Sequence, residues 1–184
     1  MRKTALLPLT LLALVSTHCW MKTHPPAGDP QHPLECKMEA MRPQIAGGPN
    51  GIRFQVINRM PGALSVLRWN TPFEGWRGTI VTVTFQGREL PYRGPMVKRG
   101  DPVAGDYMRL RASESQIIGM DLSQAYDLSK PGLYTVKVTG GVQDVIQDGT
   151  PAPRPRDRFQ GVGLVCNELT LDVKKGEADN KINY

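Results

Sequence analysis

The chain of 184 residues carries 23 basic and 17 acidic residues, which give a formal net charge of +6, and 40% of its residues are hydrophobic. This length supports one domain with a real core and two terminal segments, and the hydrophobic fraction excludes a wholly disordered chain. The lysines and arginines are scattered across predicted turns and do not cluster with stacking aromatics. The mild basicity therefore indicates a solvated surface and argues against a nucleic-acid partner.

Residues 1–20 are typical of a secretory signal peptide. Arg2 and Lys3 supply the positive start, and residues 5–15 form an apolar run that is too short to remain as a membrane-spanning helix. We therefore expect an exported protein, either periplasmic or secreted. Cleavage before Cys19 would make it a lipoprotein anchored in the cell envelope. However, His18 is a poor residue before a lipidated cysteine, which favours ordinary cleavage near residues 17–20.

Residues 21–33 read M-K-T-H-P-P-A-G-D-P-Q-H-P and predict a flexible tether. The tether contains His24 and His32. A metal site would need partners fixed nearby, so the polarity of the tether explains these histidines better than metal binding does.

Short alternating strands fill residues 34–174, the predicted folded domain. Proline and glycine turn signals separate strands predicted at residues 34–41, 52–57, 63–69, 79–85, 106–111, 117–122, 133–138 and 162–173. This regular spacing predicts an all-β fold, an immunoglobulin-like antiparallel β-sandwich of about 7–9 strands. In the last strand the alternation shifts phase near Asn167, which allows a bulge. The charged residues 175–184 predict a loose tail.

Two long connections interrupt the strands. Residues 90–105 are too rich in proline and glycine for a helix, and they carry Tyr92, Met96, Lys98 and Arg99 in an extended run, so we predict that a partner binds here. Residues 140–161 include the basic, proline-rich run D-G-T-P-A-P-R-P-R-D-R-F. This second connection predicts a mobile loop, with a polyproline binding arm as the alternative.

Export changes how the three cysteines are interpreted. Cys36 lies in the first predicted strand and Cys166 in the last, and two such cysteines are expected to pair in an oxidising compartment. The pair would join the two ends of the domain. Cys19 is then left over, and removal with the signal peptide or lipidation explains it better than a free reactive thiol.

Four blocks of sequence carry a family resemblance. They read W-N-T-P at 69–72, P-Y-R-G-P-M-V-K-R-G at 91–100, D-Y at 106–107 and D-L-S-Q-A-Y-D-L-S-K-P-G-L-Y-T-V at 121–136. In order and spacing they resemble the amino-terminal, non-catalytic pro-region of bacterial peptidyl-lysine metalloendopeptidases of the aspzincin (deuterolysin) family. In that family a zinc-protease domain follows, and this sequence contains no counterpart of it. Tyr126, shortly before Tyr134, also resembles the tyrosine corner of immunoglobulin-like sandwiches, with an ordinary half-buried tyrosine as the alternative.

The sequence offers no catalytic constellation. Every histidine lies at or before position 32, so a His-Glu-x-x-His zinc site and a Ser-His-Asp triad are both missing from the predicted domain. The aspartate pairs Asp144 with Asp148 and Asp101 with Asp106 fall in predicted turns, where aspartate is expected for backbone reasons. We therefore expect a binding protein without a cofactor or metal, and not an enzyme.

The resemblance implies a partner. A pro-region is expected to help its protease fold and to keep it inactive. A free-standing copy therefore resembles an inhibitor or folding helper of an aspzincin-type, lysine-specific metalloprotease. Lys98 would enter the specificity pocket, with Tyr92 and Arg99 beside it and prolines stiffening the loop. A solvated loop charge is the alternative for Lys98. We expect the protein to be a monomer.

Two other functions stay open at this point. One is an immunoglobulin-like interaction module of the cell envelope, tethered or lipid-anchored, with no protease partner. The other is a sugar-binding platform formed by Trp69, Phe73 and Trp76, although burial in the core is the favoured interpretation of these aromatics.

Overall fold

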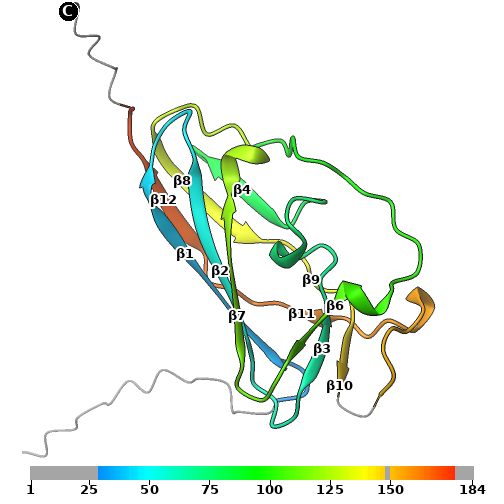
Figure 1. The fold of residues 1–184 in the computed structure, drawn as a ribbon. Helices are drawn as coiled ribbons and strands as arrows, with labels where there is room; N and C mark the ends of the chain where they lie inside the picture. Colours follow the sequence, from blue (N-terminus) through cyan, green and yellow to red (C-terminus); the bar gives the residue numbers. More distant parts are fainter. Residues whose placement is uncertain (1–28, 148–149, 177–184) are drawn as a thin grey trace, which may run out of the picture.

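The protein is all-β, as predicted (Figure 1). The computed structural model describes residues 29–147 and 150–176. The predicted signal peptide lies outside this part, as do Cys19 and His24. Of the predicted loose tail, only residues 175 and 176 are described. Within the described residues the strands are β1 (Leu34–Gln44), β2 (Asn50–Asn58), β3 (Leu64–Leu67), β4 (Val81–Phe85), β5 (Arg88–Glu89), β6 (Tyr107–Leu110), β7 (Ser115–Asp121), β8 (Gly132–Val138), β9 (Gly141–Val142), β10 (Val145–Gln147), β11 (Val162–Gly163) and β12 (Leu169–Val173).

Two larger sheets form the layers of the sandwich. One has the order β1-β2-β7 and the other β12-β8-β4-β5, and all of these pairs are antiparallel. Alternate residues of β2, β4, β8 and β12 point inward, as β-branched and aromatic alternation predicts. The buried core accordingly contains Ile52, Phe54 and Val56 from β2 and Val81 and Val83 from β4. A parallel bridge between Ile45 and Lys174 connects the edges of the two layers.

The paired strands β2 and β7 of the first sheet bend and continue into a smaller sheet of order β10-β3-β6. β2 pairs with β7, and after the bend β3 pairs with β6 and also with β10. The buried side chain of Asn58 holds the bend, because its amide nitrogen donates to the carbonyls of Gly62 (2.8 Å), Leu110 (3.1 Å) and Arg111 (2.9 Å). Its amide oxygen accepts the backbone N–H of Met60 at 2.8 Å. One buried side chain therefore satisfies the buried carbonyl of Leu110 and three part-buried backbone groups around the bend.

The predicted disulfide between Cys36 and Cys166 is present, and it connects β1 to the irregular segment that precedes β12. The single strand predicted over residues 162–173 is wrong, because this stretch holds the separate strands β11 and β12. Nor does Asn167 form a bulge. Its side chain accepts the N–H of Met38 (2.8 Å) and donates to the Met38 carbonyl (3.0 Å), so it takes the place of a strand residue beside β1.

The side-chain hydroxyls of two tyrosines form hydrogen bonds to backbone carbonyls of the domain. The hydroxyl of Tyr134 donates to the carbonyl of Lys130, four residues upstream, at 2.7 Å, as in a tyrosine corner. Tyr126 instead donates across the core to the carbonyl of Val81. The prediction of a tyrosine corner at Tyr126 is therefore wrong in its residue, because the hydroxyl that bonds a few residues upstream is that of Tyr134.

The proline-rich connection contains more regular structure than its sequence predicts. Within residues 140–161, β9 and β10 pair with β11 and β3, and a short 3₁₀ helix, η4 (Arg156–Arg158), follows. Three further 3₁₀ helices are η1 (Pro72–Glu74), η2 (Ala104–Asp106) and η3 (Leu122–Gln124). Among the described residues, no helix is long and apolar enough to cross a membrane.

We predict that Asn58→Ala lowers the free energy of unfolding by about 3 kcal/mol, because buried carbonyls lose their donors. Urea denaturation followed by circular dichroism measures this change. Gln55→Ala, on the half-exposed face of the same strand, serves as the control and should change stability by less than about 0.5 kcal/mol. Equal effects of the two substitutions would show that Asn58 does not hold the bend.

Candidate functional site

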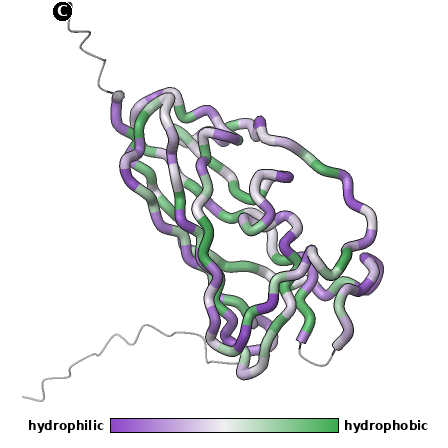
Figure 2. Tube along the Cα trace, viewed as in Figure 1, coloured by the Kyte–Doolittle hydropathy of each residue, from purple (hydrophilic) through white to green (hydrophobic). Residues whose placement is uncertain are grey.

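The candidate site is the long loop, residues 90–103, between β5 and η2. It contains no strand or helix, and none of its residues has a positive φ, so the chain is extended without tight left-handed turns. In Figure 1 the loop forms the arch on the side of the molecule away from β1 and β12. Hydrophobic and hydrophilic stretches follow each other along it (Figure 2). The extended run predicted from the sequence is therefore present.

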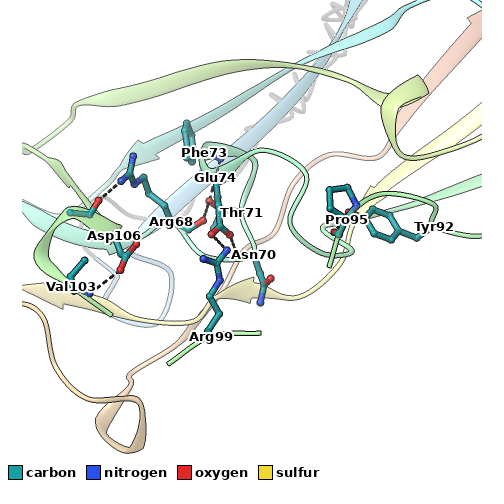
Figure 3. Close-up of polar contacts among 11 residues, drawn as sticks. Arg68, Asn70, Thr71, Phe73, Glu74, Tyr92, Pro95, Arg99, Val103 and Asp106 are labelled. Carbon is teal, nitrogen blue, oxygen red and sulfur yellow. Dashed lines mark hydrogen bonds and ion pairs between the residues drawn. The ribbon is translucent and has the colours of Figure 1, made fainter. Parts of the chain in front are cut away.

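Tyr92 anchors the beginning of the loop. Its ring lies against Trp76 (6.2 Å between centroids) and Tyr126 (5.7 Å), and both partners are buried in the core. Its hydroxyl donates to the carbonyl of Pro95 at 2.8 Å (Figure 3). The backbone N–H of Arg93 donates to the carbonyl of Ala125 at 2.8 Å. Tyr92 therefore attaches the beginning of the loop to the core.

Arg99 anchors the far end. Its guanidinium forms an ion pair with Glu74 of η1 (Figure 3). The same guanidinium lies 5.0 Å from the centre of the Trp69 ring. The Trp69 side chain is buried, and the same Glu74 carboxylate accepts the N–H of Asn70 at 3.0 Å. A cation over a tryptophan face with a carboxylate beside it is a favourable, partly desolvated arrangement. Arg99 thus points into the body of the protein.

The proline-rich connection supports the same end of the loop. Arg156 donates from Nη1 to the carbonyl of Arg99 (2.8 Å) and from its backbone N–H to Asp101 (3.2 Å). Two residues earlier, Arg154 pairs with the fully buried carboxylate of Asp144, with Nη2 2.8 Å from Oδ1. This pair fixes the backbone from which Arg156 reaches the loop.

Further hydrogen bonds surround the buried carboxylate of Asp144. Tyr107 donates its hydroxyl at 2.7 Å and Gln160 its backbone N–H at 2.8 Å. Burial and the neighbouring Asp144 charge raise the pKa of Tyr107. Asp144 therefore has a structural role, whereas Asp148 lies outside the described residues. Asp106 accepts the N–H of Val103 at 2.8 Å, so the turn aspartates serve the backbone as expected.

Between the anchors the loop is open to solvent. Met96 is 79% and Val97 41% exposed, and the Lys98 side chain is exposed with no ion-pair partner among the described residues. The backbone N–H of Val97 donates to the carbonyl of Arg77 at 3.2 Å, which holds the chain next to Lys98. One surface hollow lies beside Met96 and Val97, and another lies beside Val97 and Arg99. Of the four residues predicted to bind a partner, Met96 and Lys98 are the accessible ones.

The aromatics Trp69, Phe73 and Trp76 do not form the sugar platform that the sequence left as an alternative, and their favoured placement in the core is confirmed. Trp69 is 4% and Trp76 8% exposed, and Phe73 lies edge-on against the core residue Phe54 with ring centroids 5.7 Å apart. These aromatics belong to the core and to the anchors of the loop. In the part of the chain that the structure covers, no group of three histidine, cysteine or acidic side chains could hold a metal ion.

Several supporting residues could not be singled out from the sequence. Glu74 and Arg154 look like ordinary surface charges, and the sequence assigns Asp144 only to a turn, so only the folded chain shows which charges meet. The composition of residues 140–161 predicts a mobile loop, with a polyproline binding arm as the alternative, whereas in the structure Arg154 and Arg156 of this segment contact the rest of the protein. That segment binds the protein's own long loop.

Part of a known protein is similar in sequence to this chain. No protein-family model matches the chain. An extracellular protease of Aeromonas hydrophila is 26% identical over 147 residues, which cover 79% of this chain and 40% of the protease. The chain thus spans less than half the length of this relative and resembles one region of it. Both this similarity and the disulfide are consistent with export.

Among solved structures, the Northeast Structural Genomics Consortium target SoR45 aligns over 82% of this chain and 92% of its own, with 11% sequence identity and a TM-score of 0.39. This likeness is too remote to carry an argument about the site. The comparisons relate the chain to part of an extracellular protease and do not establish a family.

We predict that Arg154→Met lowers the free energy of unfolding by about 3–5 kcal/mol, because the buried Asp144 carboxylate loses its charge partner. Arg158→Met, an exposed arginine of η4, is the matched control and should be nearly neutral. Thermal and urea unfolding measure both variants. Similar stability of the two variants would mean that the Asp144 pair does not hold the proline-rich connection.

We predict that the protein loses stability in alkali. Burial raises the pKa of Tyr126 from 10.0 to about 12, and burial also raises the pKa of Tyr92 and Tyr134. Because the folded state holds these protons more tightly than the unfolded state, stability is full below the unfolded pKa of 10.0 and is lost as the pH rises through about 12. Urea unfolding at a series of alkaline pH values should show this fall, and Tyr126→Phe should make it shallower. An unchanged slope in that variant would contradict the assignment.

Proposed function

We propose that the protein is a non-catalytic, exported binding protein that acts on an aspzincin-type, lysine-specific metalloprotease as an inhibitor or folding helper. The observation that carries the proposal is the exposed Lys98 on a loop held at both ends, in a chain similar to part of an extracellular protease. The four sequence blocks that resemble the pro-region of lysine-specific enzymes support the same partner.

A non-catalytic role agrees with the residues of the domain. His32 is the last histidine in the sequence, it precedes β1, and its ring nitrogen lies 3.0 Å from the carboxylate of Asp29. From β1 onward the sequence therefore contains no histidine, and the three histidines before it do not have the His-Glu-x-x-His spacing of a zinc-protease helix. The protease activity belongs to the partner in this proposal.

The geometry of the loop supports tight binding. Tyr92 and Arg99 are fixed against buried aromatics, and Val97 is bonded to Arg77, so little ordering entropy remains to be lost when a partner binds residues 96–98. Met96 adds exposed apolar surface beside the lysine charge. A deep, acidic lysine pocket next to an apolar wall would be the complementary surface on the protease.

We predict that the purified mature chain inhibits a lysine-specific aspzincin protease and that Lys98→Ala raises the inhibition constant about 30-fold, as expected for a residue worth ~2 kcal/mol in binding. Hydrolysis of a lysyl peptide substrate measures this constant. Lys175→Ala replaces another exposed lysine, directly after the bridge residue Lys174, and serves as the matched control that should leave inhibition unchanged.

A second assay separates the two proposed roles. Refolding the denatured protease in the presence of the chain should raise the yield of active enzyme if the protein is a folding helper, whether or not it inhibits. Equal inhibition by the parent and by Lys98→Ala would support the proposed protease partner but contradict the proposal that Lys98 of the long loop binds it. Neither inhibition nor a refolding effect would overturn the proposal and leave the envelope interaction module as the remaining function.

A further inference from the structure

The long loop divides the chain into two halves that are interleaved in every larger sheet. Strands β1 to β5 precede it and β6 to β12 follow it. The pairs β2 with β7, β3 with β6 and β4 with β8 each join a strand of the first half to a strand of the second. The loop is the covalent connection between the halves, and the sheets connect them a second time through hydrogen bonds.

The disulfide connects the halves a third time. Cys36 lies in β1, before the loop, and Cys166 lies after it. A break of the backbone anywhere in residues 90–103 therefore leaves two fragments that are still covalently joined. Both halves also contribute to the core, for example Phe54 and Val83 from the first and Tyr134 and Leu171 from the second.

The anchors hold both sides of Lys98 independently of its own peptide bonds. Before it, the N–H of Val97 is bonded to Arg77, and Tyr92 is packed on Trp76. After it, Arg99 is held by Glu74 and Trp69, and its carbonyl accepts from Arg156. Cutting either bond of Lys98 would release few of these contacts.

Lys98 is also the lysine best placed for cleavage in the part of the chain that the structure describes. Proteases take their substrates as extended, exposed segments. Lys37 and Lys137 lie in paired strands, Lys174 forms the bridge to Ile45, and the carbonyl of Lys130 is bonded to Tyr134. Only Lys98 and Lys175 of the described lysines lie in irregular segments without such pairing.

We infer that residues 96–99 are a built-in cleavage site, at which a lysine-specific protease nicks the chain next to Lys98 without releasing either fragment. In this step one water molecule is added across the Val97–Lys98 or the Lys98–Arg99 peptide bond, which yields a new carboxylate and a new amino group. The nicked protein keeps its fold and still presents both ends of the loop to the enzyme. The identity of the enzyme rests on the proposed function, whereas the retention of the fragments rests on the strand pairing and the disulfide.

The test treats the full mature chain with two enzymes in parallel, an aspzincin-type lysine-specific metalloprotease and an unrelated lysine-specific serine endoprotease. We expect each to produce first a single nick beside Lys98, identified by intact mass and amino-terminal sequencing. On denaturing gels the nicked protein should run as one species without reductant and as two with it. In size-exclusion chromatography and circular dichroism it should match the intact chain.

The nicked chain is then tested as an inhibitor. It should retain inhibition of the metalloprotease to within about threefold of the intact chain, Lys98→Ala should not be nicked in the loop, and Lys175→Ala should be nicked normally. A first cut at another lysine would overturn the inference, and so would loss of the circular dichroism signal of β-structure after nicking. If the serine enzyme gives a folded, nicked chain while the metalloprotease neither binds nor cuts, the proposed partner is wrong and the interleaved assembly stands.

Discussion

Hydrogen bonding between the two halves of the chain is the constraint on which the rest of the structure depends. The pairs of β2 with β7 and β4 with β8 join residues that are far apart in sequence, and the loop between the halves makes no strand of its own. Asn58 holds the place where one of these paired ribbons bends, so a single buried amide sets the direction of both β3 and β6. The long loop is free to be irregular because it does not have to hold the sheets together.

The anchors of that loop use interactions that differ in kind at its two ends. At the Tyr92 end the contacts are aromatic and continuous with the core, so they are insensitive to salt. At the Arg99 end they are charged, with the Glu74 carboxylate and the Trp69 face sharing one guanidinium. Since both side chains of the ion pair are largely shielded from solvent, salt screens them less than it would an exposed pair. The loop is therefore held at both ends while its middle contacts the body mainly through the Val97 N–H.

Strand positions could be predicted because a local pattern determines them. The alternation of Thr79 to Phe85 placed β4 correctly, with Val81 and Val83 buried, and the cysteine pair followed from export and from the ends of the domain. The side chains that support the loop could not be predicted in the same way. Asn58 looks like a turn residue and Arg154 like a solvated charge, and their roles depend on carbonyls and carboxylates brought close only by the fold. The phase shift near Asn167 was a real signal, but side-chain pairing to Met38 explains it and a bulge does not.

The same geometry bears on what distinguishes an inhibitor from a substrate. An ordinary substrate leaves its protease because hydrolysis separates two flexible ends, each of which loses its contacts quickly. Here each new end would remain within a few residues of an anchor, Val97 beside Arg77 and Arg99 beside Glu74. Release of one half would require opening β2 from β7 and β4 from β8 and would still leave the disulfide, so it would approach the cost of global unfolding. Hydrolysis at Lys98 would thus change one covalent bond without weakening the surface that the enzyme binds, and departure would be limited by dissociation of the whole protein.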